Sequence, residues 1–342
     1  MRIGTYIIDP PLALAPMAGI TDKPFRMLAR DFGAAYAVGE MINGDPSLRH
    51  TAKTRRRCDF EGEGGIRAVQ IVGGDPVQMA QAARYCVENG AQVIDINMGC
   101  PVKKVCNVLA GSALLQNEPL VGRILREVVR AAGVPVTLKT RLGFAENNKN
   151  ILTIAKMAEQ EGIAALAVHG RTREQMYKGE ASYGLIAEVK RQVGLPLWVN
   201  GDITSPQKAA AVLRETGADG VMVGRGAQGR PWLFAQIGHF LAHGAPPPPM
   251  PFQKAAETVL RHLSAMYDFY GETAGLRIAR KHIGWYFACL PGGDEGRRAA
   301  YAADSAKGQY GAVADFLSRR DLDDWPDQAW GALEQAAALG VQ

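Results

Sequence analysis

The sequence has few cysteines, no strong excess of charge of one sign and no long hydrophobic run. Its 342 residues include five cysteines, none of them in a CxxC pair, which argues against a disulfide framework or a zinc cluster. The formal net charge is only +5. No apolar run approaches the ~18 residues that a membrane span needs, and the opening MRIGTYIIDPP lacks the apolar core of a signal peptide. We therefore expect a cytoplasmic protein with no bound metal and no membrane partner.

The remaining composition is that of a folded protein. Hydrophobic residues make up 47% of the chain and charged residues 21%, so a sizeable core can form and disorder is not expected. The length suits one large domain of about 250 residues with a smaller domain beside it.

A run of prolines, Pro246-Pro-Pro-Pro-Met-Pro251, divides the chain. Such a run cannot continue a helix and favours a stiff, extended linker. It predicts a first domain over residues 1–245, a linker over 246–251 and a second domain over 252–342. The second domain ends in an acidic tail, because the residues from Asp321 onward include five acids and no base.

Before the prolines, eight short apolar runs rich in β-branched residues alternate with helical patterns. The predicted strands are 12–15, 34–38, 68–72, 93–96, 135–138, 164–168, 196–199 and 220–223. The predicted helices between them include 77–88, 120–132, 151–160, 183–192, 206–215 and 231–241. Eight strand–helix units indicate an α/β fold of the (β/α)8 TIM-barrel type. A doubly wound open sheet is the alternative, but the chain has no GxGxxG turn. After the prolines, the segments 252–270, 274–290, 297–305 and 310–319 predict an all-α helical bundle.

In a TIM barrel the loops that follow the strands converge on one rim, where the active site lies. The predicted strand ends carry polar side chains or permissive backbone at nearly every position. They are Pro16, Met17, Ala18 and Gly19; Glu40 and Met41; Gln70; Asn97 and Cys100; Lys139 and Arg141; His169 and Arg171; Asn200, Gly201 and Asp202; and Gly224 and Arg225. A thiol, a lysine, a histidine, an amide and three arginines on one rim predict a site for an anionic ligand.

Each of these residues also has a simpler interpretation. Cys100 lies between Gly99 and Pro101 in a loop, where a packing residue gains little, so catalysis is favoured over burial. Lys139 either extends to solvent or points inward beside a negative charge. His169 is equally well explained as a structural histidine. The other cysteines, Cys58, Cys86, Cys106 and Cys289, are interpreted as packing or incidental surface residues. Glycines after strands seven and eight match the common phosphate site of barrels, although glycine there is also ordinary turn chemistry.

One long motif resembles a known family. The stretch Ile94-Asp-Ile-Asn-Met-Gly-Cys-Pro-Val-Lys-Lys-Val, followed after five residues by Gly111-Ser112, is similar to the signature of the tRNA-dihydrouridine synthases, flavin-dependent reductases of uridine in tRNA. Other blocks of that family are matched in order by residues 14–22, 138–141, 169–172, 200–203, 224–225 and 278–286. The bacterial B-type branch of the family is the most similar.

The resemblance implies FMN as the cofactor and NADPH, or NADH, as the reductant. The resemblance implies FMN contacts at three places. The isoalloxazine ring would be lined by Pro16, Met17, Ala18 and Gln70, with Lys139 at its pyrimidine side. The ribityl chain and phosphate would be held by Asn200, Gly201, Asp202, Gly224 and Arg225, and His169 is a further contact. Cys100 would be the proton donor, since reduction of the uracil C5–C6 double bond takes a hydride at C6 and a proton at C5. A thiol with an ordinary pKa of ~8.5 is protonated at neutral pH, so the pKa of Cys100 should not be strongly lowered.

The resemblance also implies tRNA as the partner. A base inside a barrel mouth must first leave its stack, so an RNA-binding surface has to surround the site. The residues expected to contact RNA are Asn97, Lys103, Lys104, Arg141, Arg171, Arg173, Arg277, Arg280 and Lys281, with His282 beside them. The B-type resemblance points to the D-loop, with position 17 as our expectation. Because the partner is a large RNA, we expect a monomer.

Three alternatives remain. A related FMN barrel would reduce a free pyrimidine and would not bind tRNA. A lyase would use Lys139 as a Schiff-base nucleophile, would be colourless and would be trapped by borohydride with its substrate. A tRNA-binding protein without turnover would bind RNA equally well after Cys100→Ala and would consume no NADPH.

Overall fold

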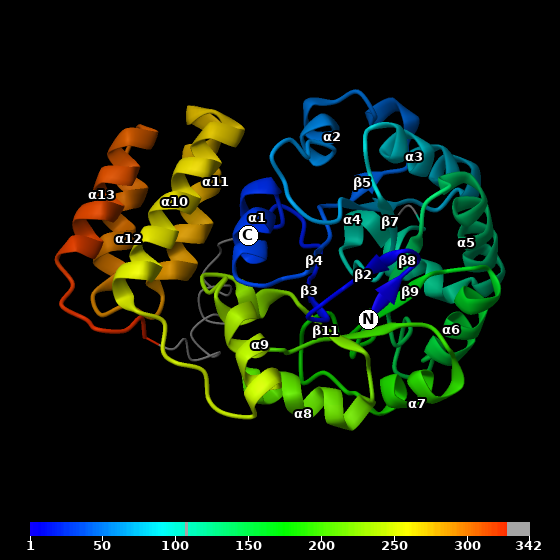
Figure 1. Cartoon of the computed structure of the whole chain (residues 1–342). Coiled ribbons are helices and arrows are strands. Elements are labelled where there is room, and N and C mark those ends of the chain that lie inside the picture. Colours follow the sequence, from blue (N-terminus) through cyan, green and yellow to red (C-terminus); the bar gives the residue numbers. More distant parts are fainter. Residues whose placement is uncertain (107–108, 327–342) are drawn as a thin grey trace. The chain divides into compact units, whose positions relative to one another are not determined.

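The computed structural model describes residues 1–106 and 109–326 (Figure 1). By their internal contacts these residues form two compact units, Met1–Gly224 and the residues from Arg225 onward, which are described separately below. The proline run lies inside the second unit. The linker over residues 246–251 stays a prediction. Within the described ranges, no helix combines the length and the apolar character that crossing a membrane requires.

The first unit is built on a parallel sheet that closes into a barrel. Its strands are β3 (Leu12–Leu14), β4 (Tyr36–Ala37), β5 (Ile42–Asn43), β6 (Ala68–Val72), β7 (Val93–Met98), β8 (Val136–Arg141), β9 (Ala165–His169), β10 (Leu197–Asn200) and β11 (Gly220–Val223). They pair in the order β4-β3-β11-β10-β9-β8-β7-β6-β5. β4 and β5 are two segments of one barrel strand, because Val38, directly after β4, forms a parallel bridge with Ala68 of β6. The eight predicted strands and the TIM-barrel fold are thus confirmed.

An aromatic pair fills the barrel interior. The rings of Tyr36 and Trp198 stack with their centroids 4.9 Å apart and their planes 8° apart. Small side chains such as Ala13 and Ala167 surround the pair, because two large rings leave little volume on the facing strands. A short antiparallel hairpin, β1 (Arg2–Ile3) and β2 (Tyr6–Ile7), precedes the barrel and contributes Ile3 to the same buried cluster.

Helices surround the strands, and Figure 1 shows several of them following one another around the outside. They are α1 (Lys23–Asp31), α2 (Ala52–Arg57), α3 (Pro76–Glu88), α4 (Lys103–Cys106), α5 (Glu118–Ala132), α6 (Ile151–Gln160), α7 (Gly184–Gln192) and α8 (Pro206–Thr216), with 3-10 turns at Pro46–Leu48 and Gly111–Gln116. Their beginnings follow ordinary capping rules: Asp75 and Ser205 accept hydrogen bonds from backbone N–H groups of α3 and α8, and a proline opens each helix.

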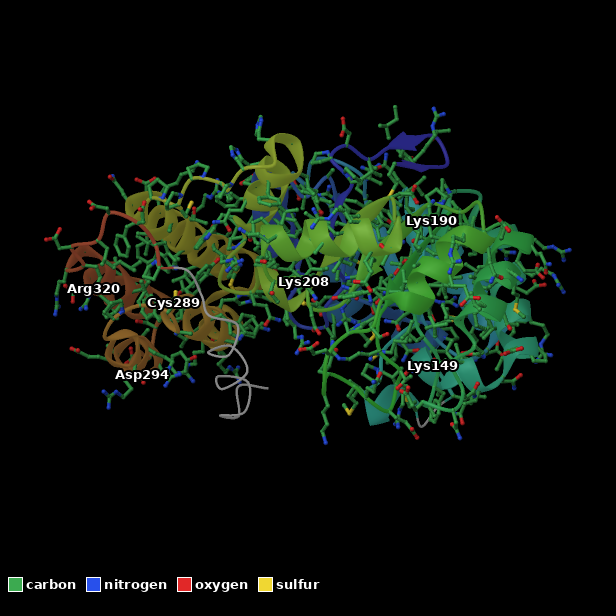
Figure 2. All side chains as sticks on the ribbon, turned by 90° about the horizontal axis from the view of Figure 1, so that it is seen from below. Lys149, Lys190, Lys208, Cys289, Asp294 and Arg320 are labelled. Atoms are coloured by element: carbon green, nitrogen blue, oxygen red, sulfur yellow. The ribbon has the colours of Figure 1, made fainter. Side chains whose placement is uncertain are left out.

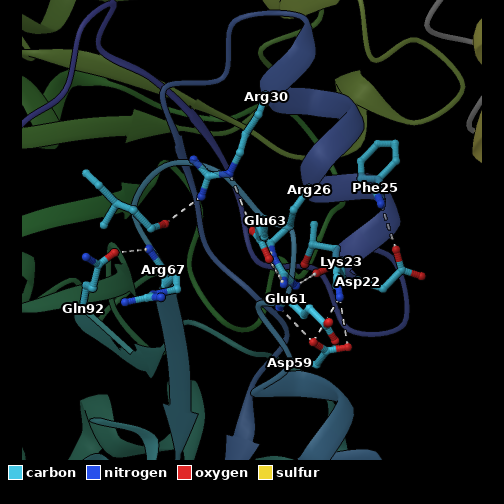
Figure 3. A network of polar contacts seen from close by, with 12 residues as sticks. Asp22, Lys23, Phe25, Arg26, Arg30, Asp59, Glu61, Glu63, Arg67 and Gln92 are labelled. Atoms are coloured by element: carbon cyan, nitrogen blue, oxygen red, sulfur yellow. Dashed lines mark hydrogen bonds and ion pairs between the residues drawn. The ribbon is translucent and has the colours of Figure 1, made fainter. Parts of the chain in front are cut away.

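A buried ion network holds α1 against the loop before β6 (Figure 3). Arg26 donates to both carboxylate oxygens of Glu63, at 2.8 and 2.5 Å, and both side chains are about 2% exposed or less. Arg30 lies 3.6 Å from the same carboxylate and donates to the Ile66 carbonyl. A more exposed ion pair, Lys23 with Asp59, lies at the beginning of the helix.

The outer surface of the first unit carries ordinary charged side chains (Figure 2). Lys190 pairs with Asp219 at 2.7 Å, and the ammonium of Lys208 lies 5.1 Å from the centre of the Tyr183 ring. Tyr183 in turn donates to the carbonyl of Gly201, next to β10. These contacts join the helical layer to the rim of the barrel.

The second unit is helical. It contains a 3-10 turn at Arg225–Ala227, then α9 (Leu233–His243), α10 (Phe252–Tyr270), α11 (Glu272–Phe287), α12 (Gly293–Ala302) and α13 (Ala306–Ser318). The last four helices pack together and confirm the predicted bundle. α10 has the predicted bounds, whereas α12 begins four residues earlier than expected. Its N-cap residue, Gly292, has a φ of 68°, a conformation that glycine adopts without steric cost.

The beginning of the acidic tail is part of this unit. The N–H of Trp325 donates to the carbonyl of Met250 at 2.7 Å, and the N–H of Phe252 donates to that of Asp323 at 2.9 Å. The Trp325 ring is 4% exposed and lies between Trp232 and Phe252, with centroid distances of 5.6 and 5.4 Å. The segment that the sequence left unassigned thus closes the linker end of the bundle. The rest of the tail, from residue 327, lies outside the described residues.

Candidate active site

The polar side chains predicted at the strand ends belong to neighbouring positions of one rim. Adjacent strands place Asn97 of β7 beside Lys139 of β8, and Asn200 of β10 beside His169 of β9. Gln70 lies on β6, next to β7. Because all these strands are parallel, their carboxyl ends meet at the same end of the barrel.

A chain of hydrogen bonds leads from the barrel interior to the loop that carries Cys100. The Gln70 amide donates to the carboxylate of Asp95 at 2.7 Å, and its own oxygen accepts from the amide of Asn97, also at 2.7 Å. The Asn97 oxygen then accepts from the backbone N–H groups of Gly99 and Cys100, at 3.1 and 2.9 Å. The loop is therefore held through its N–H groups by three side chains of the barrel wall.

The carbonyl side of the same loop is held by Ser112. Its hydroxyl and its N–H both donate to the Cys100 carbonyl, at 2.8 and 3.1 Å, and Ser112 is fully buried. Gly111 comes directly before it, with φ at +60°, and a Cβ atom there would lie 2.9 Å from the Cys100 carbonyl oxygen. Only glycine fits at this position without displacing the loop. The thiol of Cys106 lies 3.6 Å from the same carbonyl, so this cysteine packs beside the site.

The Cys100 thiol is partly buried and stays protonated at neutral pH. Burial raises its pKa, while the backbone N–H of Val102 and the charges of Arg141 and Lys139 act in the opposite direction. This direction agrees with the requirement that a proton donor keep its proton. The catalytic role itself stays a prediction.

Lys139 points inward. Its ammonium donates to the Asn200 side-chain oxygen at 3.0 Å, and the Asn200 amide donates to the carbonyl of Met222 on β11. Burial lowers the pKa of Lys139 to about 8, with Arg141 contributing and Asp95 opposing. The Lys139 side chain therefore has the inward orientation, one of the two interpretations that the sequence allowed.

The residues after β9 and β10 form a tight ion cluster. Arg171 donates to both oxygens of Asp202, at 2.8 and 2.6 Å, and to the carbonyl of Gly179. Its side chain also lies 3.3 Å from the ring nitrogen Nε2 of His169. Asp202 further accepts from the N–H of Ala181 at 2.8 Å. The expected contacts of His169, Gly201 and Asp202 with FMN stay predictions. The ion pair of Arg171 with Asp202 also holds the loop after β9, through Gly179 and Ala181.

Arg141 has a similar internal role. It is 2% exposed and donates to the carbonyls of Gly99, Thr172 and Met176, between 2.7 and 2.9 Å. Arg173 is half-buried and its guanidinium lies 5.2 Å from the centre of the Phe144 ring. The predicted RNA contacts of these arginines and of Arg171 stay untested, and burial of Arg141 and Arg171 gives both a loop-positioning role that the sequence did not reveal.

The loop after β3 carries the remaining predicted isoalloxazine contacts, Pro16, Met17 and Ala18, all at least partly exposed. The N–H of Met17 donates to the Thr21 hydroxyl, and the N–H of Gly19 donates to the carboxylate of Glu40 at 2.6 Å. A Cβ atom at Gly224 would lie 3.7 Å from the Met17 sulfur, which places the end of β11 beside this loop.

The predicted RNA contacts of the second unit differ in their exposure. Arg277 is exposed, whereas Arg280 is partly buried and donates to the carbonyl of Tyr301 at 3.0 Å. Lys281 is partly exposed. His282 is fully buried, so its predicted place on the surface path is wrong: it packs edge-on against His262, and burial holds its pKa well below the usual value. The side chains of Lys103 and Lys104 lie outside the described residues.

Two features of the first unit were not predicted from the sequence. Asp95 was treated only as part of a motif, although it is 2% exposed and anchors the hydrogen-bond chain. Its position two residues before Asn97, on the same side of a strand, was the available signal. The second feature is α2, which presents three exposed cations, Lys53, Arg55 and Arg56. Arg57 at its end ties it to the rim by donating to Glu40 and to the carbonyl of Met41.

The chemistry of this rim fits FMN. Lys139 provides a cation, and the amides of Gln70, Asn97 and Asn200 provide donors and acceptors of the kind that a flavin ring and its ribityl chain require. Across the described ranges, no group of three or more histidine, cysteine or acidic side chains could hold a metal ion.

Comparisons with known proteins find relatives that match this chain over most of its length. Residues 13–320 match the family model of dihydrouridine synthase (Dus). The chain is 53% identical to tRNA-dihydrouridine synthase B of Pseudomonas syringae pv. tomato, over 93% of this chain and 95% of the relative. It is 54% identical to the protein of the same name from Xanthomonas axonopodis pv. citri, over 93% and 96%.

Solved structures resemble the barrel at much lower identity. An old yellow enzyme homologue from Zymomonas mobilis is 14% identical, with a TM-score of 0.51, over 75% of this chain and 94% of that one. Morphinone reductase in complex with tetrahydroNAD is 14% identical, with a TM-score of 0.52, over 73% and 92%. These likenesses support the fold alone. The family match and the relatives above show that the chain belongs to the dihydrouridine synthase family.

Proposed function

We propose that this protein is a cytoplasmic, monomeric enzyme that reduces a D-loop uridine of tRNA, at position 17, to 5,6-dihydrouridine, using FMN and NADPH. The observation that carries the proposal is the Cys100 loop, at the rim of a barrel in a chain of this family. Its thiol is protonated at neutral pH, and the backbone of Cys100 is held at its N–H group by Asn97 and at its carbonyl by Ser112. The relatives of this chain are tRNA-dihydrouridine synthases, which supports tRNA as the substrate.

The protein's side chains supply the proton and the electrostatic setting. FMN, when bound, supplies the hydride that C6 of uracil receives and is recharged by NADPH. Cys100 donates a proton to C5 as negative charge develops there, and the thiolate is then reprotonated from solvent. Lys139 would place a positive charge at the pyrimidine side of the flavin, where it would stabilise the negative charge of the reduced ring. Its ammonium is already held in place by the contact with Asn200.

The remaining cofactor contacts are those that the family resemblance implies. Gln70 and the Pro16–Ala18 loop would line the ring, and Asn200, Gly201 and Gly224 would hold the ribityl chain and phosphate through polar and backbone groups. The set is completed by His169 and Asp202, which contact Arg171, and by Arg225.

Two groups of basic side chains would bind the tRNA backbone. One is the helical group Arg277, Arg280 and Lys281, and the other is the trio of α2, Lys53, Arg55 and Arg56, tied to the rim of the barrel by Arg57. Lys103, Lys104 and Asn97 beside the Cys100 loop, with Arg141, Arg171 and Arg173, complete the expected contacts. Exposed cations of this kind fix register on the phosphates and do not read sequence.

The test is to incubate the purified protein with NADPH and tRNA that lacks dihydrouridine, then to map the product by mass spectrometry beside a Cys100→Ala variant. Dihydrouridine at position 17, lost or reduced at least about 100-fold in the variant, is the expected result. Each alternative has its own outcome: reduction of a free pyrimidine only, a colourless protein trapped by borohydride, or tRNA binding with no NADPH consumption. Dihydrouridine at another position would retain the activity and refute the assigned site.

A further inference from the structure

Asp95 is the deepest polar residue in the hydrogen-bond chain, and neither the family resemblance nor the proposed reaction gives it a task. It lies in the middle of β7, 2% exposed, with one carboxylate oxygen bound by Gln70 and the other by the Thr137 hydroxyl, both at 2.7 Å. A buried carboxylate is costly in an apolar interior unless it is hydrogen-bonded. The hydrogen bonds from Gln70 and Thr137 offset that cost, so this carboxylate depends on those two partners.

The direction of the chain is fixed at the loop end. Backbone N–H groups can only donate, so Gly99 and Cys100 require the oxygen of Asn97 to face them. The nitrogen of Asn97 must then donate to the oxygen of Gln70. This leaves only the nitrogen of Gln70 to face position 95, and that position must therefore accept.

The direction is fixed in the same sense at the other end. An ionised carboxylate has only acceptors, so Asp95 admits one orientation of the Gln70 amide. Burial raises the pKa of Asp95 to about 6, opposed by its hydrogen bonds and by Lys139, so it is mostly ionised at neutral pH. An uncharged amide at position 95 would accept either orientation of Gln70. A reversed Gln70 would turn its nitrogen toward that of Asn97, and a reversed Asn97 would turn its own nitrogen toward the loop N–H groups.

We propose that Asp95 is a positioning residue for Cys100, because its carboxylate allows only the direction of the hydrogen bonds through Gln70 and Asn97 that the N–H groups of the Cys100 loop require, and excludes the reverse one. Ser112 holds only the carbonyl of Cys100, so the N–H side of the loop depends on this chain. The inference rests on the proposed role of Cys100 as proton donor, but it concerns the geometry of the loop and can be measured without turnover.

The direct measurement is amide hydrogen exchange of Gly99 and Cys100 in the full-length protein, purified with its cofactor. Asp95→Asn keeps the size of the side chain. An amide can both donate and accept hydrogen bonds, so the new side chain is no longer restricted to accepting one from Gln70. Exchange at these two amides is expected to quicken at least about fivefold, the factor that corresponds to about 1 kcal/mol for one hydrogen bond. Thr137→Val removes the other partner of Asp95 without affecting the direction of the chain, so exchange there should stay within twofold of the wild type.

Thiol reactivity gives a second readout. The rate at which iodoacetamide alkylates Cys100, followed on its peptide by mass spectrometry across pH 6 to 10, should change at least threefold in Asp95→Asn. Asn97→Ala should give the same change, and the double variant should differ little from Asn97→Ala alone, because both changes act on one chain. With tRNA and NADPH, Asp95→Asn should lower kcat while the KM for tRNA stays the same.

Wild-type exchange and alkylation in a folded Asp95→Asn protein would overturn the inference, and so would equal effects of Thr137→Val or additive effects in the double variant. If Asp95→Asn does not fold, Gln70→Ala breaks the same chain one link nearer the loop and is judged by the same criteria. Absence of dihydrouridine with the wild-type protein would refute the proposed function instead, since exchange and alkylation report the loop in either case.

Discussion

Replacing Glu63 by Gln should destabilise the first unit far more than any change at its surface. The substitution keeps the size of the side chain but removes the charge that Arg26 and Arg30 share (Figure 3). Arg26 is 2% exposed, so its guanidinium has no access to water after the change. Burial already lowers the pKa of Arg30, and the charge of Glu63 opposes that shift. Removing one partner of a buried ion pair costs about 3–5 kcal/mol, because the remaining charge stays buried without compensation.

The assay is urea unfolding followed by a probe confined to the first unit, since two units need not unfold together. Alkylation of the buried Cys86 thiol of α3, followed on its peptide by mass spectrometry, is such a probe. With a slope of about 3 kcal/mol per molar urea, the loss predicts a midpoint lower by about 1 M. Asp59→Asn is the matched control: its partner Lys23 lies on the same helix, but Asp59 is 36% exposed, so about 1 kcal/mol or less is expected. Equal midpoints for the two variants would refute the argument that burial gives Glu63 its weight.

Three further predictions follow from the site. The pKa of Lys139 is lowered from 10.5 to about 8; the unfolded chain therefore binds more protons between these values, and stability rises with pH across that window by up to about 3 kcal/mol. Lys139→Met should abolish this rise in urea titrations at pH 7 and pH 10, and an unchanged rise would contradict it. Ser112→Ala leaves the N–H contact with Cys100 but removes the hydroxyl contact, so kcat should fall about three- to tenfold with the KM for tRNA unchanged, whereas a change confined to KM would disprove the positioning role. Replacing the three exposed cations of α2 by Gln should lower the slope of log K for tRNA against log salt by about 2, and the same change at Arg126 and Arg130 of α5 should not.

Most of the fold could be predicted from local pattern. The runs 68–72 and 220–223 are strands with the predicted bounds, because short β-branched segments between turn residues have few other uses in an α/β chain. α1 and α2 were not predicted, since they have nine and six residues and their amphipathic pattern is too short to distinguish. α1 is specified instead by contacts distant in sequence, above all that of Arg26 with Glu63, 37 residues later.

The site was predicted less evenly, for a related reason. Cys100 and Lys139 could be found because a thiol in a Gly-Cys-Pro loop and a lysine after an apolar strand contradict their surroundings. Asp95 gave no such signal, since its meaning depends on Gln70 and Thr137, which come from two other strands. Which side chains meet on neighbouring strands of a barrel depends on the register of the strands, and a single sequence does not reveal that register.

The arginines of the rim show where reasoning from residue type stops. A positive side chain at a strand end suggests phosphate binding, yet the guanidinium of Arg141 lies against the carbonyls of the loops after β7 and β9. Loop carbonyls left without partners inside a rim need donors, and arginine provides five in one rigid plane. From that position Arg141 binds the Gly99 carbonyl and its charge opposes the rise that burial causes in the pKa of Cys100. Arg141 thus holds the Gly99 carbonyl of the Cys100 loop and acts against the rise in the pKa of the thiol, and both effects suit the proton-donor role proposed for Cys100.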